Sequence, residues 1–192
     1  HQPIQLITNM ESGTSNVTPL DGNDGRPQLV LDGGQFNRLY RPPIRLVIAG
    51  KGPVIVSSTE IARASDIEVT VITSEDDTAA QCESLGATAA KSLKPNSIDE
   101  WTAVATLFHE HELEGPVLSA ALDSDAFYIG ALGSRVTHAE RVERFLQAGY
   151  ADTNIARIKG PLGISIGSRN PPEIAISMVA EVLQVYRQKF PI

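Results

Sequence analysis

Cysteine is almost absent from the 192-residue sequence, which contains only Cys82. A single cysteine excludes an intramolecular disulfide and any zinc site built from several cysteines, and it is consistent with a reducing, cytoplasmic location. The sequence also contains no run of about 18 apolar residues, so no membrane span is expected. Its formal net charge of −7 argues against non-specific binding to nucleic acids, which needs clustered Lys and Arg side chains.

Residues 1–43 differ in composition from the rest of the chain, because Asn, Gly, Asp, Thr, Ser and Pro dominate them. Two short apolar islands, 4–7 and 28–31, could form edge strands or hairpin arms, and Asp-Gly pairs at 21, 24 and 32 are turn signals. We interpret 1–43 as a linker or as the remnant of a preceding domain. The chain starts at His1 rather than Met, which indicates a fragment or a processed chain, and no signal peptide is recognisable.

From Ile44 onward, short apolar runs alternate with helical patterns. Residues 44–49 and 68–72 are β-branched runs typical of buried parallel strands, and the helices expected between and after them cover 53–64 and 78–85. Strand, helix and strand on this scale form a βαβ unit. The sequence therefore predicts an α/β fold for 44–192: a Rossmann-like, doubly wound, mostly parallel sheet with helices on both faces.

The remaining elements follow the same rhythm. We expect a helix up to about Trp101 followed by a strand to 108, a helix at 116–122, a strand at 126–129, and helices at 137–148 and 171–189. Thr137 and Glu140 have the spacing of a capping box, and Gly149 is placed to end that helix. Asn170 is a suitable N-cap for the last helix.

The first candidate binding motif is the pair Gly50 and Gly52, which follows the first buried strand. A dinucleotide-binding loop requires a third glycine and an acidic residue about 20 positions later. Here the third glycine position is Ile55, and Glu75 comes slightly late. The motif therefore matches only part of an NAD(P)-binding loop, and an NAD(P)-dependent oxidoreductase is an alternative function.

The second candidate motif is a glycine turn between a buried strand and a helix start. Its residues are Gly130, Gly133, Ser134, Arg135, Thr137 and His138. A helix N-terminus that follows such a turn is suited to an anion, because exposed amides and the helix dipole both point at the turn. The alternative is an ordinary βα turn with Arg135 and His138 solvated.

A similar arrangement precedes the last helix, where Gly163, Gly167 and Arg169 lie before Asn170. Gly-Ser-Arg thus occurs twice, at 133–135 and 167–169, and each copy precedes a helix. Guanidinium groups combined with helix-start amides would bind a phosphate or a planar acidic heterocycle. His109 and His111 alternate as metal ligands can, but no third ligand follows from their spacing, and we favour a surface loop. Cys82 is expected to be inert packing.

These motifs resemble the C-terminal Rossmann domain of the XdhC/CoxI family. The resemblance rests on Ala121-Leu-x-Ser-x-Ala-Phe-Tyr-Ile-Gly-Ala-Leu-Gly-Ser-Arg-x-Thr-His138 and Ile158-x-Gly-Pro-Leu-Gly-Ile-x-Ile-Gly-Ser-Arg-x-Pro-x-Glu-Ile-Ala175. It implies an accessory protein for molybdenum hydroxylases of the xanthine dehydrogenase or carbon monoxide dehydrogenase type, not itself an oxidoreductase. Such proteins bind molybdenum cofactor, support its sulfuration by a cysteine desulfurase, and pass it to the apo-enzyme. They are commonly homodimers.

By position, the resemblance assigns a pterin or phosphate pocket to the two glycine-turn motifs described above. Three features depart from the family pattern. Pro53 and Ile55 replace the His and last Gly of the first glycine loop, and Thr73 and Ser74 replace an Asp pair. The family's N-terminal domain, with its Gly-Gly-Cys motif, is not recognisable in 1–43. A Rossmann domain that has lost its ligand and is purely structural is therefore a further alternative.

Overall fold

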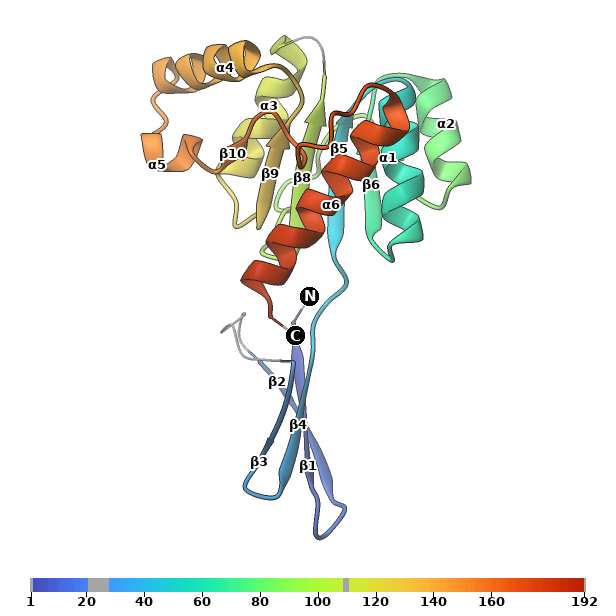
Figure 1. The fold of residues 1–192 in the computed structure, drawn as a ribbon, viewed down its shortest axis with the longest axis vertical. Helices are drawn as coiled ribbons and strands as arrows, with labels where there is room; N and C mark the ends of the chain where they lie inside the picture. Colours follow the sequence, from blue (N-terminus) through green and yellow to red (C-terminus); the bar gives the residue numbers. More distant parts are fainter. Residues whose placement is uncertain (1, 21–27, 109–110, 192) are drawn as a thin grey trace. The chain divides into compact units, whose positions relative to one another are not determined.

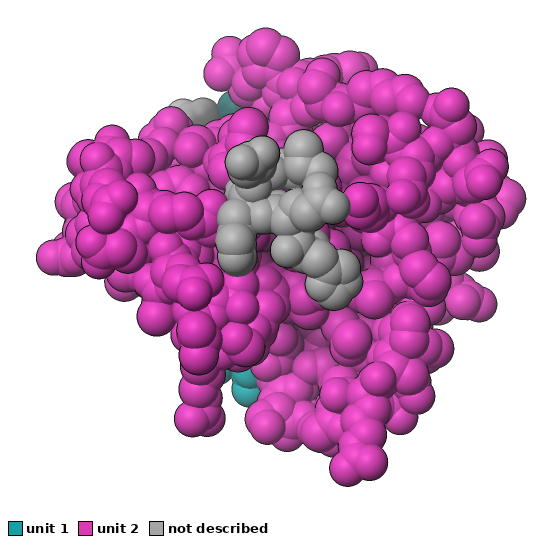
Figure 2. Space-filling view, turned by 90° about the horizontal axis from the view of Figure 1, so that it is seen from above, with its two compact units in different colours: residues 1–43, 184–192 teal, residues 44–183 magenta. Residues whose placement is uncertain are grey.

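The strands of the protein form two separate sheets, as seen in a computed structural model that describes residues 2–20, 28–108 and 111–191. The chain divides accordingly into two units, residues 1–43 with 184–192 and residues 44–183, which Figure 2 distinguishes by colour. Each unit is described separately below.

The larger unit contains a six-stranded parallel sheet in the order β10-β9-β8-β5-β6-β7 (Figure 1). The strands are β5 (Arg45–Gly50), β6 (Glu68–Ile72), β7 (Thr88–Ala90), β8 (Thr102–Leu107), β9 (Tyr128–Ala131) and β10 (Ile158–Lys159). The chain proceeds outward from β5 in one direction and then returns to β8 on its other side. This is the predicted doubly wound Rossmann order, and its switch point lies between β5 and β8.

Helices cover both faces of this sheet. They are α1 (Pro53–Ala64), α2 (Asp76–Ser84), α3 (His111–Leu122), α4 (Arg135–Gln147), α5 (Asp152–Ile155) and α6 (Pro171–Lys189). Figure 1 shows α1 and α6 in front of the sheet and α3 behind it. On the α3 face, a core cluster joins Val47 and Val104 of the sheet to Leu118 of α3 and Phe145 of α4. The crossover between β7 and β8 contains no helix.

Local signals explain where several helices begin and end. α1 starts at Pro53, whose missing amide costs nothing in the first turn. α6 starts where predicted, because the Oδ1 atom of Asn170 accepts a hydrogen bond from the amide of Glu173 at 3.0 Å. α4 ends as predicted at Gly149, which has a φ of 90°. The amides of Gly149 and Tyr150 donate to the carbonyls of Leu146 and Phe145, which is the Schellman arrangement.

Two local predictions were wrong. Residues 98–101 form a turn and not a helix, because the Oδ1 atom of Asp99 accepts hydrogen bonds from the amide of Trp101 and the hydroxyl of Thr102. α4 begins at Arg135, two residues earlier than predicted. Ser134 is its N-cap and accepts from the amide of Thr137 at 3.1 Å, so Thr137 and Glu140 do not form the capping box.

Within the larger unit, other boundaries moved and three short elements were not predicted. α2 and α3 begin before the predicted residues 78 and 116, and Pro116 lies inside α3. β7, α5 and β10 were missed because each has at most four residues, too few to establish a period. Cys82 is fully buried, as predicted for a packing residue. Burial raises the pKa of its thiol, although a hydrogen bond from the hydroxyl of Thr59 opposes that shift.

The smaller unit is built on a four-stranded antiparallel sheet in the order β2-β1-β4-β3. Its strands are β1 (Ile4–Asn9), β2 (Ser15–Pro19), β3 (Leu29–Asp32) and β4 (Gln35–Tyr40). The two apolar islands are therefore hairpin strands. Gly33 and Gly34 connect β3 to β4 with φ values of 53° and 77°, as a type I′ turn requires. The turn signals at 21 and 24 lie outside the described residues, and the origin of 1–43 as the remnant of a preceding domain stays a prediction.

Candidate functional site at the carboxyl edge of the parallel sheet

Most of the predicted binding residues lie in loops that follow the carboxyl ends of the parallel strands. Gly50 ends β5 and Gly52 follows it, Gly133 follows β9, and Gly163 follows β10. In an open parallel sheet, ligands bind in the crevice outside these ends. The loops differ, however, in how many backbone donors they leave available.

The loop after β5 already uses the amide of its second glycine. The amide of Gly52 donates to the Thr78 hydroxyl at 3.2 Å, and that hydroxyl donates to Glu75 at 2.8 Å. Pro53 has no amide to offer. Gly50 is needed for packing, since a Cβ atom there would lie 2.8 Å from the carbonyl oxygen of Leu107. This loop is therefore poorly suited to the pyrophosphate of a dinucleotide bound in the usual mode.

The turn after β9 leaves a helix N-terminus open to an anion. The Ser134 hydroxyl accepts a hydrogen bond from the Thr137 amide, and the first turn of α4 contains no acidic residue to compete for the amides of Arg135 and Val136. Arg135 is exposed. Gly133 is required here because its φ is 140° and a Cβ atom would lie 2.8 Å from the Thr137 methyl group. Helix dipole, amides and one guanidinium thus suit a negatively charged group at the start of α4.

A buried ion pair, which sequence reasoning did not find, holds this turn in place. Arg141 of α4 donates from Nε and Nη2 to the two carboxylate oxygens of Glu114 in α3, each at 3.0 Å, and both side chains are only 1% exposed. Arg144 donates to the same carboxylate at 2.8 Å. Arg141 also donates to the carbonyl of Leu132 at 2.8 Å, which fixes the residue between β9 and Gly133.

His138 contacts both this ion pair and Gly160, which follows β10. Its Nδ1 atom is 3.4 Å from Nη1 of Arg141. Because arginine has only donors, Nδ1 accepts, and the proton of the neutral ring is on Nε2. The ring also packs on Gly160, where a Cβ atom would lie 2.1 Å from Nδ1, so Gly160 belongs with the candidate site although it was not predicted. Neutral His138 can therefore offer one Nε2–H donor to a ligand.

The pKa of His138 is expected to lie below its ordinary value of about 6.5. Burial lowers the pKa first, the charge of Arg141 lowers it further, and Glu114 opposes the shift. Since the folded-state pKa is depressed, the associated stability is present above about pH 6.5 and is lost as the pH falls through the folded-state pKa. An NMR titration of the imidazole resonances, assigned with His138→Gln, checks this; a midpoint at or above the ordinary value would contradict it.

A second buried network joins β9 to α6. Tyr128 donates to Oε2 of Glu181 at 2.6 Å, and the amide of Gly163 donates to the same oxygen at 2.7 Å. Burial, followed by the hydrogen bond and charge of Glu181, raises the pKa of Tyr128. The Tyr128 ring covers Gly130, where a Cβ atom would lie 2.4 Å from the phenol oxygen. Gly130 and Gly163 therefore have packing roles that do not require a ligand.

The start of α6 already binds a carboxylate of the chain itself, that of Glu173. The Glu173 carboxylate accepts hydrogen bonds from the amide of Arg169 at 2.6 Å and from the side chain of Asn170 at 2.9 Å. Gly167 and Arg169 are exposed, and a Cβ atom on Gly167 would meet nothing within 4 Å. Because Glu173 already neutralises this helix start, an external anion is favoured less here than at α4.

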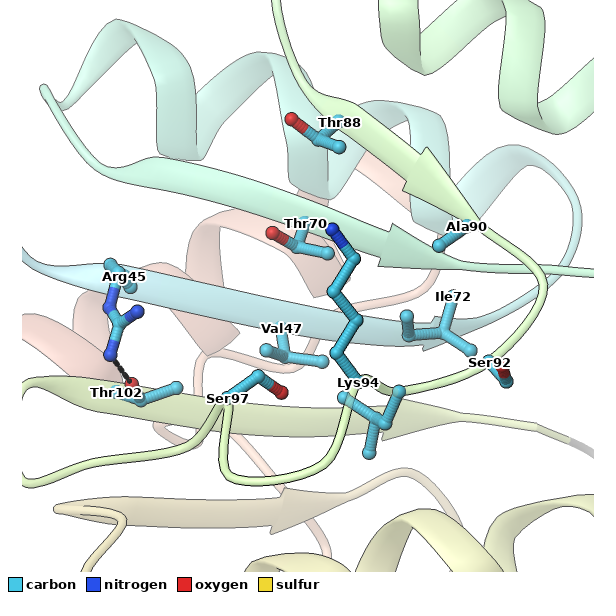
Figure 3. A pocket seen from close by; sticks show the side chains of 11 residues that line it. Arg45, Val47, Thr70, Ile72, Thr88, Ala90, Ser92, Lys94, Ser97 and Thr102 are labelled. Atoms are coloured by element: carbon cyan, nitrogen blue, oxygen red, sulfur yellow. Dashed lines mark hydrogen bonds between the residues drawn. The ribbon is translucent and has the colours of Figure 1, made fainter.

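Three pockets lined by described residues surround the crossover between β7 and β8. The face pocket lies under the crossover, and Figure 3 shows Lys94 extended across it; its volume of about 140 Å³ is small for a ligand site. Arg45, which lines it, is ion-paired with Asp99 at 2.5 Å. The outer pocket, near 93–98 and 123–125, has about 460 Å³. The edge pocket, with about 440 Å³, is lined by Thr73, Ser74, Lys91, Leu93, Phe108 and Val117.

The metal interpretation of His109 and His111 is not tested, because His109 and the side chain of His111 lie outside the described residues. Within the described part of the chain, no three His, Cys, Asp or Glu side chains are grouped as a metal site. No helix in that part is long and apolar enough to span a membrane.

Comparison with known proteins identifies relatives for most of the chain. Residues 46–182 match the family model described as the XdhC Rossmann domain. The chain is 31% identical over 146 residues to the molybdenum cofactor insertion chaperone PaoD of Escherichia coli, covering 76% of this chain and 41% of PaoD. It is 26% identical over 162 residues to a Bacillus subtilis protein named as a probable xanthine dehydrogenase component, covering 80% of this chain and 46% of that protein. The chain thus spans less than half of each.

The fold also matches a solved structure. A crystal structure of a Bacillus halodurans protein described as a xanthine dehydrogenase superposes with a TM-score of 0.75 and 21% sequence identity. The match covers 98% of this chain and 61% of the other. At this identity, the likeness establishes the fold.

Proposed function

Since this chain belongs to the family of XdhC Rossmann domains, we propose that it is part of an accessory protein for molybdenum hydroxylases and binds molybdenum cofactor. The name of PaoD, a molybdenum cofactor insertion chaperone, supports this proposal. The observation that carries it in the structure is the N-terminus of α4, which offers amide donors, an exposed Arg135 and a first turn without an acidic residue. The chain contributes binding and release, without covalent chemistry of its own.

The residues at α4 fit the phosphate of a pterin cofactor. The amides of Arg135 and Val136 and the Arg135 guanidinium would hold the phosphate, and the Nε2–H group of neutral His138 would donate a further hydrogen bond. When bound, the cofactor supplies the molybdenum and dithiolene sulfur that the client enzyme uses. The chain's residues orient its anionic end.

The proposal also covers partners and location. We propose that the protein transfers the cofactor to a molybdenum hydroxylase apo-enzyme and acts with a cysteine desulfurase in sulfuration of the cofactor. We further propose that it is a homodimer and that it is cytoplasmic. Family membership supports the first of these most directly. Light scattering of the purified chain tests the homodimer.

Anaerobic calorimetry with molybdenum cofactor tests the binding site. Replacing Arg135 with alanine is expected to weaken binding about tenfold or more, because a charge-assisted hydrogen bond contributes about 1.5–3 kcal/mol. Arg169→Ala is the matched control, since it removes an exposed arginine before a helix start that Glu173 already neutralises. Its effect is expected to be at most about threefold.

Three results would contradict the proposal. Equal losses in the two arginine variants would argue against an anion site at α4. Binding of NADH or NADPH with no binding of the cofactor would favour the oxidoreductase alternative and the loop at Gly50 and Gly52. Absence of binding by every ligand would favour a structural Rossmann domain.

A further inference from the structure

The edge pocket lies beside the switch point of the sheet, away from the turn at α4. Thr73 follows the end of β6, and Phe108 follows the end of β8. These two strands flank β5 on either side, so the pocket occupies the part of the carboxyl edge where open α/β sheets bind ligands. Its volume of about 440 Å³ is within the usual range for small-molecule sites.

One polar side chain in the pocket wall, Thr73, is buried, and its hydroxyl proton is available to a ligand. Thr73 is 4% exposed, and its hydroxyl oxygen accepts a hydrogen bond from the amide of Glu75 at 3.2 Å. The hydroxyl proton has no acceptor within the described residues. A buried donor of this kind costs free energy unless an incoming group accepts from it, so the pocket favours a ligand with an acceptor on its edge.

The remaining lining selects an uncharged, flat ligand. Phe108 and Leu93 are partly buried apolar side chains packed against the core, and Val117 of α3 is buried. Lys91 forms an ion pair with Asp76, so the rim carries no excess positive charge for a phosphate. Besides the exposed hydroxyls of Ser74 and Ser92, the lining offers apolar walls, one aromatic ring and one buried hydroxyl donor. Such a lining suits a heteroaromatic ring that stacks and accepts one hydrogen bond from Thr73.

We propose that the edge pocket binds a planar heteroaromatic ring, of the size of a nucleobase or a pterin, whose edge accepts a hydrogen bond from Thr73. The ring is neutral and packs between Phe108 and the α3 wall at Val117. The proposal goes beyond the function proposed above. It rests on the edge pocket alone and does not depend on anion binding at α4.

Calorimetric titration of the purified chain with neopterin, adenosine and cytidine tests this inference, because none of these probes carries a phosphate. Ala120 is exposed and lines the pocket, so Ala120→Phe places a ring in the cavity without disturbing the core. It is expected to weaken binding about tenfold or more. Ala80→Phe, at an exposed alanine of α2 outside the pocket, is the matched control and should leave affinity unchanged. Thr73→Val is expected to weaken binding about three- to tenfold.

The probes distinguish the source of the ring. Binding of neopterin alone assigns the pocket to a pterin, and binding of a nucleoside alone assigns it to a nucleobase; both support the inference if Ala120→Phe weakens binding. Failure of all three probes to bind, or binding that is indifferent to Ala120→Phe and Thr73→Val, would overturn it. Arg135→Ala should not change ring binding, so failure here is separate from failure at the α4 anion site.

Discussion

Replacing Arg141 with methionine is expected to lower the free energy of unfolding by about 3 kcal/mol, the lower end of the cost of breaking a buried ion pair. The substitution leaves the Glu114 carboxylate buried and removes its bidentate hydrogen bonds from Arg141. The lower end applies because Arg144 still donates to that carboxylate. The loss corresponds to a fall in melting temperature of about 6–12 °C for a chain of this size.

Trp101 provides the measurement. It is the one tryptophan of the chain, it is 1% exposed, and it lies in the larger unit, so its fluorescence reports unfolding of the sheet that contains β9. Arg144→Met is the control, because that side chain is 38% exposed and should contribute at most about 1 kcal/mol.

A double variant separates the ion pair from the other contacts of Arg141. Glu114→Met with Arg141→Met removes both charges, so much of the lost stability should return. The recovery should be incomplete, because the hydrogen bond to the carbonyl of Leu132 is also lost. A double variant as unstable as the sum of the two single variants would show that the residues are not coupled.

The parts of the fold that were predictable from sequence are those specified by neighbouring residues. Pro53 and Asn170 determine where α1 and α6 begin, and the β-branched runs of β5 and β6 identify buried parallel strands. These signals act within one turn of helix or one strand. The doubly wound topology then follows from the alternation of strands and helices.

The candidate site was only partly predictable, because its geometry depends on contacts between distant residues. The glycine turn at Gly133 was visible in the sequence. Glu114 and Arg141 are 27 residues apart, and Tyr128 and Glu181 are 53 residues apart, so no local pattern pairs them. Sequence reasoning also could not show that Glu173 neutralises the start of α6, which distinguishes that helix from α4.

Gly163→Ala is expected to destabilise the protein by about 2–5 kcal/mol, the sum of a backbone cost and a packing cost. The backbone of Gly163 has a φ of 92°, which costs an L residue about 1–2 kcal/mol. A Cβ atom would also lie 2.3 Å from the Ser177 hydroxyl and 3.1 Å from its carbonyl carbon in α6. Relieving that overlap is expected to cost about 1–3 kcal/mol more. Thermal unfolding followed by Trp101 fluorescence measures the sum.

Gly167→Ala is the matched comparison, because it isolates the backbone contribution. Gly167 has a φ of 72°, but a Cβ atom there would meet nothing within 4 Å, so the expected loss is about 1–2 kcal/mol. Gly163→Ala combined with Ser177→Ala should recover only part of the Gly163→Ala loss, since the α6 backbone remains close. Equal losses in Gly163→Ala and Gly167→Ala would show that α6 yields to the methyl group. Gly163 would then be required for its backbone conformation alone, and not for the close approach of the β10 loop to α6.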